Sequence, residues 1–181
     1  MTEKERADYL QILDKYPEVF SEKPGFCGIV DHEVPMIEGF RPKHMKAYKV
    51  PDKLKEEVGR QITELLDLGF IEPCNTTSQV SPLVCVLKPP DKEGKRNVRI
   101  CIYYRYVNQF TRPAVSILED ISEIIQRVGG SRYISKFDAK SGYHQCPVKP
   151  EGRWLTAFVY DNQIYQWKRV PFGMVGSGDT F

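Results

Sequence analysis

The sequence contains no apolar run long enough to cross a membrane and no secretory signal at its start. A membrane-spanning helix needs roughly 18 or more consecutive apolar residues, and no segment of the 181 residues approaches that length. The opening decapeptide, MTEKERADYL, has neither a basic nor an apolar signal region. We therefore expect a soluble intracellular protein of the cytoplasm or nucleus, with no membrane partner.

Cysteine is scarce and widely spaced. The five cysteines are odd in number and form no CxxC pair, which argues against both a disulfide framework and a zinc site. We expect reduced thiols that lie mostly in the core. They are Cys27, Cys74, Cys85, Cys101 and Cys146.

An excess of one charge is also absent, since 26 basic residues face 24 acidic ones and the net charge is +2. Overall charge therefore does not indicate a nucleic-acid-binding protein. Between residues 88 and 105, however, six basic residues accompany only two acidic ones. The six are Lys88, Lys92, Lys95, Arg96, Arg99 and Arg105. We expect a polyanion to bind at this cluster.

No repeat or low-complexity tract is present, and a hydrophobic content of 41% is sufficient for one domain or lobe. The pattern predicts an amphipathic helix that ends near Pro17, an extended arm over 21–50, and a helix from about Leu54 with Asp52 as N-cap and Gly69 at its end. Hairpins are predicted at 82–88 with 97–104 and at 155–160 with 164–169, a helix at 120–128, and a strand at 132–137. The fold class is α+β.

Asp138 follows the predicted strand and precedes a Ser-Gly turn. A carboxylate that projects beyond a sheet can bind Mg²⁺, which takes one or two carboxylates together with substrate phosphates. An aspartate in this position is nevertheless more often a helix N-cap or a turn residue. Both interpretations of Asp138 remain open on the residues alone.

Four segments occur in an order that carries a resemblance: GFIEPCNTTSQVSPLVCVLKPPDKEGKRNVRICIYYRYVN, YISKFDAKSGYHQ, TAFVYDNQIYQWKRVPFGM and the closing TF. Together they resemble the reverse transcriptase of gypsy-type LTR retrotransposons, from about Leu54 to Phe181. The resemblance implies a right-hand polymerase fold, with fingers at about 51–112 and 146–175 and a partial palm at about 113–145 and 176–181. Residues 1–50 resemble the linker between protease and polymerase.

The resemblance also implies roles for single residues. Asp138 matches the first of three palm carboxylates, which hold two Mg²⁺ ions for nucleotidyl transfer. Tyr143 matches the aromatic residue under the incoming sugar, and Arg99 matches the arginine over the incoming base. A core tyrosine and a solvated arginine are the structural alternatives.

Further matches extend this implied site. Lys88, Lys92 and Lys95 lie where the family has a basic hairpin tip that touches the triphosphate or the template, and which lysine makes the contact stays open. Lys88 and Lys95 are the candidates for the triphosphate, and Lys92 is the candidate for the template. Arg96, Arg105 and Asn108 would contact the template or organise its grip. Phe172 and Gly173 match the lining of the nucleotide pocket, although Pro-Phe-Gly after a hairpin is also ordinary turn chemistry. The lysines individually are explained almost as well by a solvated charge run.

The sequence departs from the family pattern at several positions. Tyr103 replaces the aspartate of D-Y-R, VSIL at 115–118 replaces Y-P-x-P, and Gly176 and Asp179 replace Asn and Ala in the last motif. No Y-x-D-D turn is present. We therefore expect a fragment of an RNA-directed DNA polymerase that is inactive alone, with a template-primer, dNTP and the remainder of the polymerase as partners. The alternative is a non-catalytic nucleic-acid-binding or host-recruited interaction module.

Overall fold

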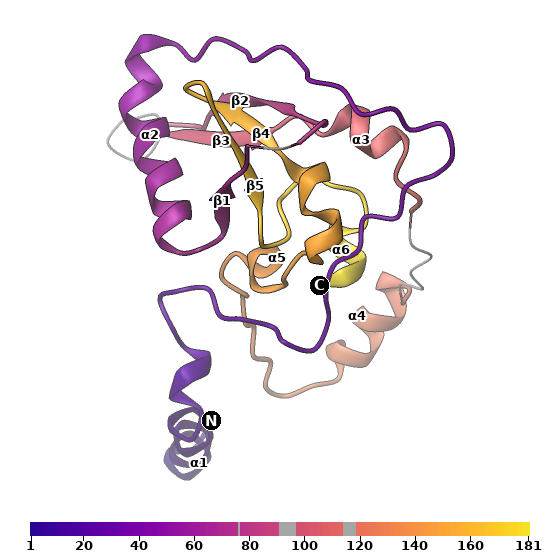
Figure 1. Cartoon of the computed structure of the whole chain (residues 1–181). Helices are drawn as coiled ribbons and strands as arrows, with labels where there is room; N and C mark the ends of the chain where they lie inside the picture. Colours follow the sequence, from indigo (N-terminus) through magenta and orange to yellow (C-terminus); the bar gives the residue numbers. More distant parts are fainter. Residues whose placement is uncertain (76, 91–96, 114–118) are drawn as a thin grey trace. The chain divides into compact units, whose positions relative to one another are not determined.

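The computed structural model describes residues 1–75, 77–90, 97–113 and 119–181. The chain divides into two compact units (Figure 1). The smaller unit comprises Met1–Gly25 and Val115–Gly142, and the larger comprises Phe26–Ala114 and Tyr143–Phe181. Within the described ranges, no helix combines the length and the hydropathy that a membrane span requires.

A five-stranded mixed sheet forms the centre of the larger unit, in the order β1-β5-β4-β2-β3. The strands are β1 (Ile71–Pro73), β2 (Ser81–Leu87), β3 (Val98–Ile102), β4 (Phe158–Tyr160) and β5 (Gln163–Trp167). β2 pairs antiparallel with β3 and parallel with β4. Both predicted hairpins are therefore confirmed, and the parallel pair joins them into one sheet.

The second hairpin is closed by a two-residue turn. Tyr160 pairs with Gln163, and both intervening residues have positive φ, 47° at Asp161 and 62° at Asn162. Positive φ at both central residues is the geometry of a type I′ turn, which Asn and Asp tolerate better than most residues. The first strand of this hairpin, β4, is shorter than the predicted range 155–160, because Leu155 and Thr156 lie in a 3₁₀ helix, η2 (Pro150–Thr156).

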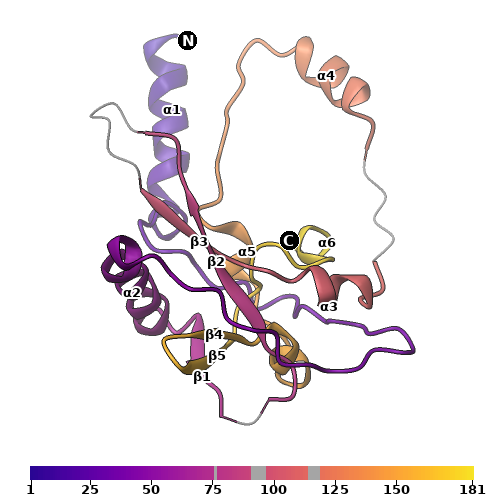
Figure 2. The same ribbon diagram turned by 90° about the horizontal axis from the view of Figure 1, so that it is seen from above.

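Helix α2 (Asp52–Asp67) packs on the sheet, as Figures 1 and 2 show. Its buried residues, Val58 and Ile62, lie four positions apart and therefore face the strands together. The helix ends at Asp67 with Leu68 as C-cap, and Gly69 follows with φ of 66°. The N–H of Phe70 donates to the carbonyl of Leu65, as in a Schellman motif. The predicted N-cap was wrong by one position, because Pro51 holds it.

The main core lies between α2 and the sheet. Its buried members are Val58, Ile62, Phe70, Ile71, Leu83, Val98, Phe158 and Trp167. A second core lies beneath the arm and consists of Val34, Tyr104, Val107, Leu155 and Met174. Burial raises the pKa of the Tyr104 hydroxyl, which donates to the carbonyl of Thr156 at 2.8 Å. Together these clusters fix the strands on which the site residues lie.

The predicted extended arm is confirmed from Phe26 to Val50, which contains no helix. Isolated bridges attach it to the body at His32↔Val148, Met36↔Thr111 and His44↔Val80. The remaining helices of the larger unit are short: α3 (Arg105–Gln109), α5 (Gly142–Gln145) and α6 (Ser177–Thr180).

The smaller unit contains α1 (Glu3–Asp14), η1 (Pro17–Val19) and α4 (Ile121–Gly129). Asp120 caps α4, as its predicted start requires, because its side chain accepts the N–H of Ser122 at 2.7 Å. The predicted strand at 132–137 was wrong: the segment is exposed and carries no strand assignment. A strand needs a neighbouring backbone, and no described strand pairs with this segment.

Candidate nucleic-acid interface

The Pro-Phe-Gly loop after β5 is held by one side chain of α3. The Nδ2 group of Asn108 donates to the carbonyl of Gly173 at 2.8 Å, and the N–H of Val175 donates to Oδ1 of Asn108 at 3.1 Å. Gly173 has φ of 91°, a conformation that glycine adopts without strain. Asn108 therefore orients the loop that carries Phe172.

Phe172 and Tyr143 form an aromatic surface. Their ring centroids lie 5.0 Å apart, and Phe181 meets Tyr143 edge-on at 5.9 Å. Phe172 keeps 54% of its surface exposed. The two flat rings are thus held in place yet open to a ligand.

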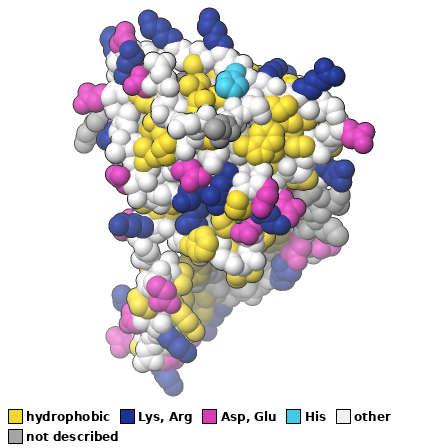
Figure 3. Space-filling view, viewed as in Figure 1, with side chains coloured by type: hydrophobic (Ala, Val, Ile, Leu, Met, Phe, Trp, Pro, Cys, Tyr) yellow, Lys and Arg dark blue, Asp and Glu magenta, His cyan; other side chains and the backbone are white. Residues whose placement is uncertain are grey.

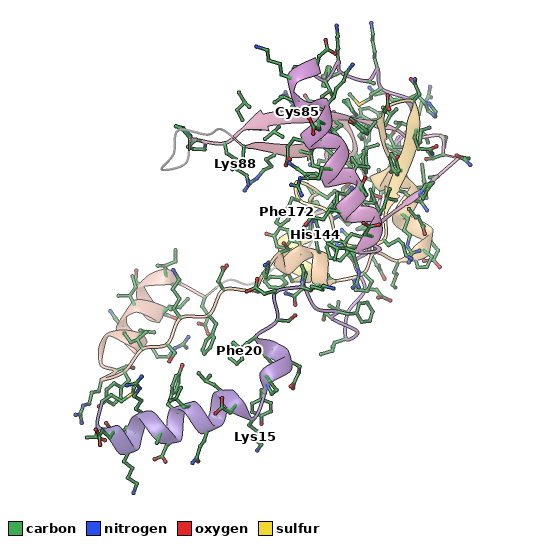
Figure 4. All side chains as sticks on the ribbon, turned by 90° about the vertical axis from the view of Figure 1, so that its left-hand side faces the viewer. Lys15, Phe20, Cys85, Lys88, His144 and Phe172 are labelled. Atoms are coloured by element: carbon green, nitrogen blue, oxygen red, sulfur yellow. The ribbon has the colours of Figure 1, made fainter. Side chains whose placement is uncertain are left out.

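His144 packs against this aromatic surface. Its ring stacks on Trp167 at 4.9 Å and meets Phe172 at 4.8 Å, and Figure 4 shows His144 beside Phe172. Nδ1 lies 2.9 Å from the carbonyl of Val170. Burial lowers the pKa of His144, so the imidazole is neutral and donates through Nδ1. No sequence pattern indicates this role, since a single histidine in a turn has many uses.

The β2–β3 hairpin carries two basic side chains on one face. Val86 pairs with Arg99, and the N–H of Lys88 donates to the carbonyl of Asn97 at 2.8 Å. Because alternate residues share a face, Lys88 and Arg99 point to the same side. Val98 points to the opposite side, where it is buried against α2.

The basic face of the hairpin adjoins the Pro-Phe-Gly loop at its base. A Cβ atom at Gly173 would lie 4.0 Å from the carbonyl oxygen of Ile102, the last residue of β3. Figure 4 shows Lys88 farther along the hairpin and Cys85 beside α2. The structure therefore brings Tyr143, Phe172 and Gly173 together near the strand that carries Arg99.

Other predicted site residues are less constrained. Arg105 is exposed in the first turn of α3. Lys92, Lys95 and Arg96 lie outside the described residues. On the face in Figure 3 the described basic side chains are interspersed with acidic ones, in keeping with the small net charge.

Asp138 belongs to the smaller unit, where it is exposed and follows the unpaired segment 132–137. No cluster of three or more His, Cys, Asp or Glu side chains among the described residues is arranged to hold a metal ion. Asp138 is thus a single carboxylate, and the geometry of the larger unit does not include it.

Replacing Asn108 with aspartate is expected to loosen the Pro-Phe-Gly loop. Aspartate keeps the acceptor for Val175 but loses the donor to Gly173, and it sets an anionic oxygen against that carbonyl. The loss of one partly exposed hydrogen bond should lower the free energy of unfolding by about 1–2 kcal/mol. Urea denaturation measures this loss. Asn97→Asp is a control of equal charge change, and an equal loss in both variants would refute a specific loop contact.

Comparison with known proteins identifies the relatives of this chain. The sequence model described as "Reverse transcriptase (RNA-dependent DNA polymerase)" matches residues 88–181. The retrovirus-related Pol polyprotein from transposon opus of Drosophila melanogaster is 34% identical over 140 residues, which cover 77% of this chain and 14% of that protein. The enzymatic polyprotein of figwort mosaic virus is 32% identical over 149 residues, 82% of this chain and 22% of that protein.

Solved structures show the same fold. Prototype foamy virus protease–reverse transcriptase matches with a TM-score of 0.79 and 25% identity, over 98% of this chain and 23% of that one. A foamy viral protease–reverse transcriptase in complex with an RNA/DNA hybrid matches with a TM-score of 0.75 and 20% identity, over 98% of this chain and 23% of that one. The 181 residues thus span a small part of their relatives. The chain belongs to the reverse transcriptase (RNA-dependent DNA polymerase) family.

Proposed function

We propose that this chain is the fingers and partial palm of a gypsy-type LTR retroelement polymerase, and that it grips the template-primer and the incoming dNTP. The fingers comprise about 51–112 and 146–175, the partial palm about 113–145 and 176–181, and residues 1–50 a linker. The observation that carries the proposal is the loop at Phe172, held by Asn108 against Tyr143 at the base of the basic hairpin face. The related proteins are retroelement and viral polyproteins.

Each side chain has a task that suits its chemistry. The planar guanidinium of Arg99 lies over the incoming base and donates to phosphate oxygens, while Lys88 and Lys95 neutralise the triphosphate. Tyr143 supports the sugar and excludes a ribose 2′-hydroxyl, and Phe172 and Gly173 line the pocket. Lys92, Arg96 and Arg105 follow the template backbone, and Asn108 keeps the local fold.

Mg²⁺ is the metal ion that suits this chemistry. An exposed carboxylate such as Asp138 can bind it, because Mg²⁺ keeps several waters and substrate phosphates as further ligands. When two ions are bound in the complete enzyme, they activate the primer 3′-hydroxyl and neutralise the triphosphate. The 181 residues supply one matching carboxylate, so we expect no nucleotidyl transfer without the remainder of the polymerase.

A second candidate function is a non-catalytic module that binds nucleic acid. It rests on the same basic face, because phosphate contacts by Lys88, Arg99 and Arg105 need neither a metal ion nor a complete palm. The two candidates agree on binding and differ only in whether chemistry follows once a complete palm is present.

Arg99→Ala is expected to weaken binding of a labelled RNA template–DNA primer about tenfold, because one charge-assisted contact is worth roughly 1.5 kcal/mol or more. Fluorescence anisotropy in low salt measures the affinity. Arg60→Ala is the matched control, since it removes the same charge from an exposed position on α2. Equal weakening by the two variants would show non-specific attraction and would overturn the proposed interface.

A further inference from the structure

Two cysteines face one another where the arm meets the segment after α5. The N–H of Cys27 donates to the carbonyl of Gln145 at 2.7 Å, as the N–H of His32 donates to that of Pro147 at 2.8 Å in the parallel bridge His32↔Val148. In a parallel pair a residue donates to the one before its partner, so Cys27 lies opposite Cys146. Pro147 has no N–H and cannot complete that bridge.

This register places the two cysteines within disulfide range. Neighbouring strands lie about 4.8 Å apart, and the Cα atoms of disulfides lie about 4.4–6.8 Å apart. Cys27 packs against the buried cluster of Cys146, Val148 and Val170, and each of the two thiols affects the pKa of the other. The register and the spacing of neighbouring strands are therefore compatible with a disulfide between them.

The environments of the two thiols differ. Cys27 is half-buried, and Ile29 is 96% exposed, because the arm takes five residue steps from 27 to 32 where the facing segment takes two from 146 to 148. The N–H of Ile29 and, less strongly, that of Val30 lower the pKa of Cys27, against an opposing effect of burial. Burial raises the pKa of Cys146, which is 2% exposed. One thiol is accessible and thiolate-prone, and its neighbour is sheltered.

We propose that Cys27 and Cys146 are a reversible redox pair, which a small-molecule disulfide such as oxidised glutathione converts to an intramolecular disulfide. The Cys27 thiolate attacks one sulfur of the oxidant, so that a mixed disulfide forms and one glutathione thiolate leaves. Cys146 then loses its proton and attacks the Cys27 sulfur, which releases the second glutathione. Two protein thiols are oxidised, and one glutathione disulfide is reduced to two thiols.

The bond fixes the arm to the segment that carries the aromatic surface. The N–H of Cys146 donates to the carbonyl of Tyr143 at 3.1 Å, and the N–H of Val170 donates to the carbonyl of Cys146 at 2.9 Å. Oxidation therefore restrains both ends of the site, Tyr143 and the segment after β5 that leads to Phe172. This inference does not depend on the proposed function.

Titration of the purified chain with glutathione redox buffers, followed by alkylation and non-reducing peptide mapping, tests the pair. We expect one cross-link, between the peptides of Cys27 and Cys146, with loss of two hydrogen atoms in mass and reversal by dithiothreitol. A disulfide between Cys27 and Cys146 closes a long loop of the chain, so it should raise the melting temperature by on the order of 5–10 °C. Cys74→Ser, the control, should keep the cross-link and the shift.

Cys27→Ser and Cys146→Ala should each abolish both the cross-link and the rise in melting temperature. Cys27→Ser also serves if Cys146→Ala fails to fold, because Cys27 lies outside the buried core. A cross-link between Cys85 and Cys101 instead, a cross-link between chains, or stable glutathionylation of Cys27 without resolution by Cys146 would each overturn the proposal. So would an oxidised form in which all five thiols remain free to alkylation.

Discussion

Lowering the pH from 7 to 5 is expected to reduce the free energy of unfolding of the larger unit by up to about 4 kcal/mol, or about 2 kcal/mol for each of two histidines. Burial lowers the pKa of His32, which is 1% exposed, and that of His144, which is 8% exposed. As the pH falls, the unfolded chain therefore binds more protons at these two histidines than the folded chain does. The contribution of the two neutral imidazoles to the free energy of unfolding is fully present above the unfolded pKa of about 6.5 and falls progressively below it.

The contacts of the two imidazoles explain why protonation is costly. Nδ1 of His32 lies 2.7 Å from the hydroxyl of Thr180, while its Nε2 is buried without a hydrogen-bond partner in the described structure. Glu33 opposes the shift of His32 by favouring its charged form, but burial is the larger effect. For His144, burial is again the larger effect on the pKa: the hydrogen bond to the carbonyl of Val170 opposes it, and the guanidinium of Arg169 acts in the same direction as burial.

Urea denaturation at pH 7, 6 and 5 measures the dependence. His144→Gln and His32→Gln should each reduce the slope of stability against pH by about half, whatever they do to stability at pH 7. His44→Gln, which removes an exposed imidazole, is the control variant. Exposed carboxylates whose folded pKa is lowered by a hydrogen bond from a lysine, such as Glu22 with Lys140 and Asp52 with Lys55, lose their contributions at lower pH. An unaltered slope in both buried variants would contradict the assignment.

Local patterns in the sequence predicted local structure well. The spacing of Val58 and Ile62 and the position of Gly69 are enough for α2, because a helix closes its hydrogen bonds within itself. The two hairpins were predicted for the same reason, since a turn sets strand pairing over few residues. These elements position the basic face that carries Lys88 and Arg99.

Features that depend on distant partners were missed or wrong. Segment 132–137 has strand composition, yet strand pairing requires a second backbone that the described chain does not provide there. The hydrogen bond between Asn108 and Gly173 spans 65 residues, and the stack of His144 on Trp167 lies where the segment after α5 pairs with the segment after β5, at Pro147↔Arg169. Motif order placed Tyr143 and Phe172 in one site, but their support arises only in three dimensions.

Raising the salt concentration from about 50 to about 200 mM is expected to weaken template-primer binding by about 10²–10³-fold. Each phosphate contact made by Lys or Arg releases a condensed counterion, so about four to six contacts give this loss. Lys88, Arg99 and Arg105 are the described candidates, and Lys92, Lys95 and Arg96 extend the cluster in sequence. Fluorescence anisotropy over a salt series gives the slope directly.

Single variants separate binding from chemistry. Lys88→Ala should reduce the slope of log affinity against log salt by about one contact, whereas Asp138→Asn should change neither affinity nor slope, because a metal ligand contributes no phosphate neutralisation. A flat salt dependence would discard the interface for both candidate functions. Primer extension by the 181 residues distinguishes them further: dNTP incorporation that Asp138→Asn abolishes would show that one matching carboxylate suffices, against our expectation. Salt-sensitive binding without dNTP incorporation would mean that catalysis requires further carboxylates besides Asp138. Adding the remaining palm in trans then tests whether nucleic-acid binding by these residues serves catalysis.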